Sequence, residues 1–190
     1  MQHNFDLSEN DYVKKHAHQS GVLWLTGLSG SGKSSIANFV AKELFEKYQI
    51  MILDGDDVRS GLNKDLSFTD EDRTENLRRV AEVASLFRQK GMIVLCSFIS
   101  PLNEQRKKVR EIVKDKFHLV YINTSLAECE KRDPKGLYEK ARAGKIPNFT
   151  GIDSPFEEPN HSEIIINTAN KSIEDCAKEL INYIEKNFKI

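Results

Sequence analysis

Residues 27–34 read GLSGSGKS and match the pattern G-x-x-x-x-G-K-[ST], which constrains the fold of this chain more than any other segment. An apolar run at residues 22–26 precedes the pattern, and apolar residues recur at helical spacing over residues 36–48 after it. A strand, a glycine-rich loop and a helix in this order bring backbone N–H groups and a helix N-terminus to a phosphate. The sequence therefore predicts a nucleoside triphosphate site here, and not a glycine-rich turn without a ligand.

The residue types of this loop suit phosphate chemistry. Its glycines let the backbone approach phosphate oxygens closely. Lys33 is expected to reach the β- and γ-phosphates, and the Ser34 hydroxyl is expected to bind Mg²⁺. The residues predicted to bind the nucleotide in this segment are Gly27, Leu28, Ser29, Gly30, Ser31, Gly32, Lys33, Ser34 and Ser35.

Length and charge exclude several classes of partner. The 190 residues suit one α/β domain, and 28 basic against 29 acidic residues leave no basic field for nucleic acid or anionic lipid. No apolar run approaches the ~20 residues of a membrane span, and the polar N-terminus has no apolar signal core. Cys96, Cys129 and Cys176 are widely spaced, which favours free thiols. We expect a cytoplasmic protein without nucleic acid or membrane partners.

Apolar runs and helical patterns alternate along the chain, which predicts an α/β fold with a mostly parallel five-stranded sheet and helices on both faces. The predicted strands are residues 22–26, 50–53, 92–98, 119–122 and 164–166. The predicted helices are residues 36–48, 72–90, 103–114, 125–132 and 172–188, with approximate ends. Residues 1–20 are expected to form a loose tail or a short surface helix, and residues 21–190 a single domain.

One segment interrupts this alternation. Residues 133–160 contain Pro134, Pro147, Pro155 and Pro159 and have no sustained apolar period. A long segment without regular structure inside a compact domain is usually functional or disordered. Because this one also carries basic and aromatic residues, we predict a lid that closes over an anionic ligand.

Candidate reactive residues follow two further predicted strands. Asp54 and Asp56 flank a glycine directly after the second strand, where one carboxylate can hold Mg²⁺ through water and the other can accept a hydroxyl proton. The alternative is an acidic turn that caps a helix. Ser100 follows the third strand and faces the same cleft, although a turn cap explains it equally well.

A group of arginines lies between these candidates. Arg59 and Arg73 can bind phosphate or sulfate oxygens in a bidentate manner, and Asn76 shares a helix face with Arg73. Phe68 in a polar loop is a candidate platform for stacking a ring. The competing interpretations are solvated helix charges for the arginines and a loop anchor for Phe68. The group favours an acceptor that carries anionic groups.

Six strings together identify a resemblance to adenylyl-sulfate kinases, also called APS kinases, over residues 21–158. These strings read WLTGLSGSGKSS, LDGDDVRSGLNKDL, FTDEDRTENLRRVAEVASLF, SFISP, DPKGLYEKARAG and NFTGIDSPFEEP. The resemblance implies a three-layer P-loop NTPase-type fold and a homodimer that requires Mg²⁺. It also implies transfer of the γ-phosphoryl of ATP to the 3′-hydroxyl of adenosine 5′-phosphosulfate (APS). The products would be 3′-phosphoadenosine 5′-phosphosulfate (PAPS) and ADP, made in sulfate assimilation.

The resemblance also implies residue roles. Asp56, with Asp54, would orient or deprotonate the 3′-hydroxyl near Mg²⁺. Ser34 would bind this ion directly and Asp56 would hold it through water, while Arg132 would pack beside the ATP base. The arginines with Asn76 would bind the phosphosulfate, two phenylalanines would enclose the acceptor adenine, and the lid would close over both nucleotides. The implied substrate-binding residues are Asp56, Arg59, Phe68, Arg73, Asn76, Ile99, Ser100, Lys135, Gly136, Leu137 and Phe149.

Ser100 matches a family position often assigned as a phosphoserine intermediate. A loose phosphoryl-transfer transition state mainly needs in-line positioning and charge stabilisation, which Lys33, Mg²⁺ and the loop supply. A serine relay would need two separate in-line geometries. Our hypothesis is that Ser100 binds or positions the substrate.

Three other functions compete with this interpretation. A different small-molecule kinase of the same fold would act on a nucleoside or sugar, but the arginine and phenylalanine positions suit an anionic purine nucleotide. A regulatory GTPase is disfavoured because residues 63–66 read NKDL, whereas guanine recognition requires N-K-x-D. A non-catalytic nucleotide binder is disfavoured because Lys33, Ser34, Asp54 and Asp56 are all present.

Overall fold

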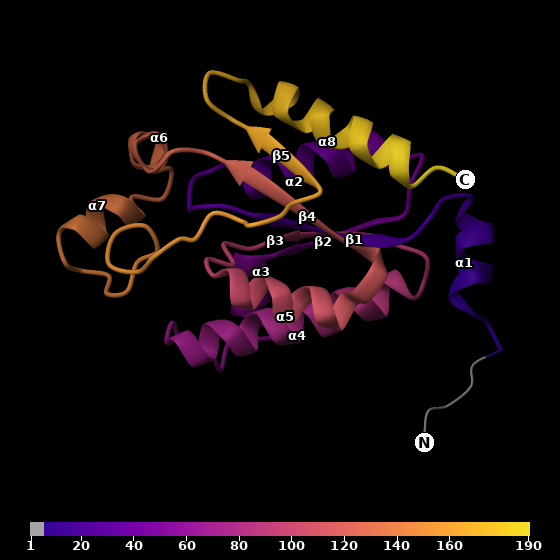
Figure 1. The fold of residues 1–190 in the computed structure, drawn as a ribbon, viewed down its shortest axis with the longest axis horizontal. Coiled ribbons are helices and arrows are strands. Elements are labelled where there is room, and N and C mark those ends of the chain that lie inside the picture. The colour runs from indigo at the N-terminus through magenta and orange to yellow at the C-terminus, as the bar shows by residue number, and fades with distance from the viewer. Residues whose placement is uncertain (1–5) are drawn as a thin grey trace.

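The computed structural model describes residues 6–190, so the first five residues of the predicted N-terminal tail lie outside the described residues (Figure 1). One five-stranded sheet has the order β2-β3-β1-β4-β5, and every neighbouring pair of strands is parallel. The strands are β1 (Gly21–Thr26), β2 (Ile50–Asp54), β3 (Ile93–Ser97), β4 (Phe117–Asn123) and β5 (Ile164–Asn167). The predicted sheet is confirmed, and it is parallel throughout.

Helices cover both faces of this sheet, as predicted (Figure 1). They are α1 (Glu9–His16), α2 (Lys33–Leu44), α3 (Gly55–Ser60), α4 (Asp70–Arg88), α5 (Asn103–Val113), α6 (Leu126–Arg132), α7 (Leu137–Arg142) and α8 (Ile173–Asn187), with a 3₁₀ turn η1 (Lys114–Lys116). One face packs against α2 and α8, and the other packs against α4 and α5. At the carboxyl ends of the strands, α6 and α7 extend to one side of the sheet (Figure 1).

The central strand β1 explains the two layers of core. Leu23 and Leu25 join the cluster formed with α2 and α8, whereas Val22 and Trp24 join the cluster formed with α4 and α5. Alternate side chains of a strand point to opposite faces, so a strand buried on both faces reads as a continuous apolar run. Because parallel strands end at the same edge, the loops after β1, β2 and β3 meet there.

The lid segment differs from its prediction. It was expected to lack regular structure, but Leu137–Arg142 forms the helix α7. The Asp133 carboxylate accepts the backbone N–H groups of the first residues of this helix, and Tyr138 and Ala141 are buried. A helix of six residues is too short to show an apolar period or to be stable alone. Its cap and its tertiary packing stabilise it, and the sequence pattern shows neither.

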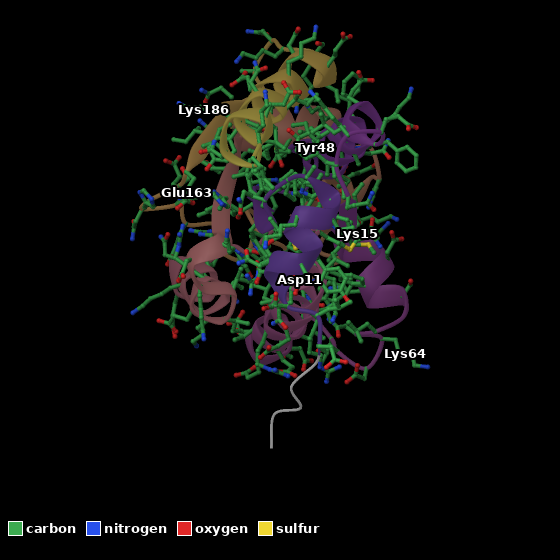
Figure 2. All side chains as sticks on the ribbon, turned by 90° about the vertical axis from the view of Figure 1, so that its right-hand side faces the viewer. Asp11, Lys15, Tyr48, Lys64, Glu163 and Lys186 are labelled. Carbon is green, nitrogen blue, oxygen red and sulfur yellow. The ribbon has the colours of Figure 1, made fainter. Side chains whose placement is uncertain are left out.

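The N-terminal segment forms a short surface helix, one of the two structures expected for it. Figure 2 looks onto α1, whose exposed residues Asp11 and Lys15 mark its outer side. Glu9 pairs with Arg88 of α4 at 2.9 Å, and Val13 is buried against the domain. These contacts attach the segment to the end of the sheet opposite α6 and α7 (Figure 1).

The cysteines and the apolar character of the helices were both addressed by the sequence. The three cysteines are free and buried, as the sequence indicated. Over residues 6–190, none of the helices combines the length and the apolar character that crossing a membrane requires.

Candidate active site

A cavity of about 1240 Å³ lies at the carboxyl ends of the strands, bordered by the phosphate loop, α3, α4 and the lid segment. Nearly all of the sequence-predicted site residues line it. These are Ser29, Gly30, Ser31, Gly32, Lys33, Ser34, Ser35, Asp54, Asp56, Arg59, Phe68, Arg73, Asn76, Ile99, Ser100, Arg132, Lys135, Leu137 and Phe149. Gly27, Leu28 and Gly136 are not part of the cavity lining.

The phosphate loop forms the floor of the cavity. The buried Lys33 ammonium donates hydrogen bonds to the backbone oxygens of Gly27 at 2.9 Å and Leu28 at 2.7 Å. These two residues therefore contribute through their carbonyl groups beneath the loop. A Cβ atom on Gly27, whose φ is +154°, would lie 2.6 Å from the Ile122 backbone oxygen, so a larger residue does not fit. Burial lowers the pKa of the Lys33 side chain to about 8.

Oxygen atoms from the start of α2 and from the ends of β2 and β3 meet at Ser34, the residue that follows this lysine. The Ser34 hydroxyl donates to Asp54 Oδ2 at 2.5 Å and lies 3.1 Å from Ser97 Oγ. Hydroxyl and carboxylate oxygens are the donors that Mg²⁺ prefers, so these residues fit the expected ion. The structure brings Asp54 to Ser34, whereas Asp56, the carboxylate predicted to hold the metal, has a different partner.

The partner of Asp56 is Lys135 of the lid segment. The two side chains form an ion pair, and both are largely exposed. Asp54 Oδ1 accepts the backbone N–H of Asp56 at 3.0 Å and so caps α3. The interpretation of this acidic turn as a helix cap is therefore correct for Asp54, which also contacts Ser34. The ion pair links α3 to the lid across the cavity.

The predicted acceptor residues Arg59, Phe68, Arg73 and Asn76 come from α3, α4 and the loop between these helices. The Arg59 guanidinium is 4.4 Å from the centre of the Phe68 ring, which is a cation–π contact. With 62% of its surface exposed, Phe68 is not an anchor in a satellite core. Partial burial lowers the pKa of both Arg59 and Arg73 from its ordinary value, but arginine stays charged at neutral pH.

Arg73 connects two loops that are distant in the sequence. Its guanidinium donates to the Phe68 backbone oxygen at 3.0 Å, to Thr150 Oγ1 at 3.1 Å and to the Asn148 backbone oxygen. These acceptors lie beside the two phenylalanines predicted to enclose a base, since Phe149 stands between Asn148 and Thr150. The Phe149 ring packs edge-on against Tyr138 of α7, with centres 5.0 Å apart. Arg73 thus holds both aromatic loops in place.

Comparison with known proteins identifies the family of this chain. Residues 19–167 match the family model described as Adenylylsulphate kinase. The chain belongs to the adenylyl-sulfate kinase family. It is 54% identical over 189 residues to the adenylyl-sulfate kinase of Bacillus licheniformis, covering 98% of this chain and 96% of that protein. The adenylyl-sulfate kinase of Staphylococcus carnosus is 50% identical over 185 residues, covering 96% of this chain and 93% of the relative.

A solved structure from the same family has a similar fold. It is the Mycobacterium tuberculosis APS kinase in complex with AMPPNP and APS, with a TM-score of 0.85 and 47% sequence identity. The match covers 88% of this chain and 98% of that one. The α/β fold expected from the family resemblance is therefore confirmed.

The Ser100 hydroxyl of this adenylyl-sulfate kinase has a hydrogen-bond partner within the protein. Ser100 is 2% exposed, and its Oγ accepts a hydrogen bond from the Trp24 indole at 2.8 Å. Its φ of +45° lies in the left-handed region, which non-glycine residues seldom adopt. Its backbone oxygen accepts from Arg106 at 2.5 Å. Whether Ser100 binds or positions the substrate stays a prediction, and this geometry shows what holds its hydroxyl and backbone in place.

Arg132 lies beside the phosphate loop and donates to the Ser31 backbone oxygen at 3.4 Å. Its guanidinium donates to Glu128 at 3.0 Å and to the Thr168 backbone oxygen at 3.2 Å. Thr168 follows β5 and lines the cavity, although it is not among the sequence-predicted site residues. The missed lining residues with polar side chains include Ser97, Thr150, Thr168, Asn170 and Lys171. Most of these missed residues could have been predicted, because polar residues at or after the end of a buried parallel strand lie at the edge of the sheet where ligands bind.

Proposed function

We propose that this protein transfers the γ-phosphoryl group of ATP to the 3′-hydroxyl of APS, giving PAPS and ADP for sulfate activation. One observation carries the proposal. A single cavity joins a phosphate loop to the predicted acceptor residues, in a chain 54% identical to an adenylyl-sulfate kinase over nearly its whole length. The proposal includes one kinase domain over residues 21–190 with a lid at about 133–160, a homodimer and a cytoplasmic location.

The donor side of the cavity has the parts that ATP requires. The loop N–H groups and the N-terminus of α2 face the phosphates, and Lys33 supplies a positive charge beside them. Ser34 and Asp54 would hold Mg²⁺, with Asp56 reaching the ion through water. When bound, Mg²⁺ would neutralise charge on the β- and γ-phosphate oxygens. Arg132 borders the cavity where we place the ATP base.

On the acceptor side, Asp56 orients the 3′-hydroxyl and accepts its proton. This role requires the Asp56 carboxylate to leave Lys135, and the exposed position of both groups makes that exchange inexpensive. Arg59, Arg73 and Asn76 bind the phosphosulfate, and the two phenylalanines enclose the adenine beside the Ile99 backbone. Lys135, Gly136 and Leu137 close with the lid.

The test is an ADP-release assay with ATP and Mg²⁺ that compares APS with AMP, adenosine and gluconate as acceptors. We expect turnover with APS alone. Turnover with gluconate or adenosine instead would favour the other candidate, a small-molecule kinase with a sugar or nucleoside acceptor. Equal rates with APS and AMP would show that the sulfate is not recognised and would contradict the proposal.

The role of Asp56 has a matched control in the same helix. Asp56→Asn removes the base while keeping the side-chain size, and we expect kcat to fall about 10²-fold or more while ATP still binds. Asp57 is exposed, lies next to Asp56 in α3 and does not line the cavity. Asp57→Asn should retain normal turnover. Equal losses in the two variants would show a general charge effect and not proton transfer.

A further inference from the structure

Asn63 lies behind the wall of the cavity, in the loop that follows α3. It is the first residue of the NKDL string, an imperfect guanine-recognition motif that also ends one of the six family strings. The side chain is fully buried and does not line the cavity. The Asn63 backbone N–H donates to the Val58 oxygen at 2.9 Å, which fixes the loop against α3.

The Asn63 side chain contacts one residue of the predicted acceptor group. Its Nδ2 atom donates to Asn76 Oδ1 at 2.9 Å and also to the Asn76 backbone oxygen at 3.5 Å. A backbone carbonyl oxygen can only accept hydrogen bonds, so the end of the Asn63 amide that faces α4 must be the nitrogen. Asn76 Oδ1 therefore turns inward to accept from it.

The orientation of Asn63 determines what Asn76 offers to the cavity. With Oδ1 turned inward, Asn76 Nδ2 is the free end of the amide, and within residues 6–190 it has no protein partner. Asn76 lines the cavity although it is only 3% exposed. Its amide therefore presents hydrogen-bond donors, which an anion requires, and not an acceptor, which would repel an anion.

This orientation of Asn63 has an energetic cost at the other end of its amide. Asn63 Oδ1 is buried, and it has no hydrogen-bond partner among the described residues. Buried polar atoms are nearly always paired, so an unpaired one calls for an explanation. Turning the Asn63 amide would place its oxygen against the Asn76 backbone oxygen, an acceptor that cannot turn to become a donor.

We propose that Asn63 is a positioning residue that selects the donor orientation of the Asn76 amide and thereby favours the anionic phosphosulfate of the acceptor. The inference rests on the proposed function, because it takes the phosphosulfate as the group that Asn76 binds. Asn63 itself does not touch the substrate. Over residues 6–190, none of the hydrogen bonds of Asn63 reaches the phosphate loop, so we expect its effect to be confined to the acceptor half of the cavity.

The test is a double-mutant cycle in the ADP-release assay, with Asn63→Leu, Asn76→Leu and the combined variant. Asn63→Leu keeps the volume and removes the donor, so the Asn76 amide is free to turn. We expect its KM for APS to rise about tenfold, the effect of losing one hydrogen bond to a charged group, with KM for ATP within about twofold of the parent. In the Asn76→Leu background, Asn63→Leu should add no further increase.

A matched control comes from the end of α3, just before this loop. The Ser60 hydroxyl donates within its own turn to the Asp57 backbone oxygen at 2.8 Å and, among the described residues, is not hydrogen-bonded to either asparagine. Ser60→Ala therefore perturbs local structure alone, and its KM for APS should not change.

If Asn63→Leu does not fold, Asn63→Asp is the second variant. A carboxylate accepts hydrogen bonds from Asn76 Nδ2, which turns the Asn76 oxygen to the cavity and should raise KM for APS at least as much.

The outcomes separate this inference from the proposed function. An unchanged KM for APS in the folded variant would overturn the role of Asn63, and so would an equal increase in the Asn76→Leu background. A parallel rise in KM for ATP would show a structural effect on the whole cavity and would also overturn it. If the parent protein does not use APS at all, the proposed function fails first and this inference fails with it.

Discussion

The two halves of the cavity are built differently. The centre of the donor half is one continuous segment, the phosphate loop, whose backbone surrounds a buried lysine. The acceptor half is assembled from α3, α4 and the lid, and one of its hydrogen bonds, from Arg73 to Thr150, joins residues 77 positions apart. Its ion pair between Asp56 and Lys135 is exposed to solvent. The donor half is therefore organised locally, whereas the acceptor half depends on contacts between distant segments.

This difference has an energetic consequence. Backbone groups and a buried side chain have little freedom to lose when a ligand binds. Exposed ion pairs contribute little to stability, so the ion pair between Asp56 and Lys135 holds the lid only weakly before substrate binds. We infer that the donor half is ready for ATP before APS arrives, while the acceptor half is completed by its substrate. Changes on the two sides should therefore affect different kinetic constants.

The largest effect is expected in the donor half. Lys33→Met removes the positive charge from the phosphate loop, and kcat/KM for ATP should fall about 10³-fold. Lys42→Met is the control, because Lys42 is exposed in the same helix and does not line the cavity. Steady-state rates with saturating APS provide the measurement. A loss smaller than tenfold would mean that the loop backbone alone stabilises the transferred group.

A smaller effect is expected where Arg73 joins the two aromatic loops. Arg73→Gln breaks this bridge and removes a charge, so KM for APS should rise about 30-fold while KM for ATP stays within about twofold. Arg78→Gln is the control in the same helix, because Arg78 pairs with Glu75 outside the cavity. An equal rise in both Michaelis constants would show that the two halves are not independent.

The pH dependence tests the donor half without a substitution. Burial disfavours the charged form of Lys33 and lowers its pKa to about 8, so the free protein loses this charge as the pH rises through that value. We expect kcat/KM for ATP, which reports the free enzyme, to be about tenfold lower at pH 9 than on its plateau. With ATP saturating, kcat/KM for APS should lack this step. A matching decline in both profiles would assign the ionisation to another group.

The smallest effect is expected where the lid contacts the loop. The Tyr138 hydroxyl donates to the Ser29 backbone oxygen at 3.0 Å, and its ring supports Phe149. Tyr138→Phe keeps the ring and removes the hydroxyl, so KM for ATP should rise about threefold, the effect of one neutral hydrogen bond. Tyr183→Phe is the control, because that hydroxyl pairs with His118 outside the cavity. A rise in KM for APS alone would place the effect on Phe149.

Much of this protein could be predicted from its sequence. The phosphate loop is a contiguous motif between a strand and a helix, so its residues and their neighbours are local information. The five strands and the parallel sheet follow from apolar runs alternating with helical periods, because buried parallel strands need crossover helices. The family strings extended this prediction to acceptor residues that line the same cavity.

The tertiary structure alone decided how the side chains pair. It placed Asp54 instead of Asp56 beside Ser34, folded α7 around an Asp133 cap, and turned the Asn76 amide through a contact with Asn63. The physical reason is that each of these choices depends on the distance and direction between groups on different elements. A local period or motif fixes which residues reach the edge of the sheet, but only packing determines which of their atoms meet there.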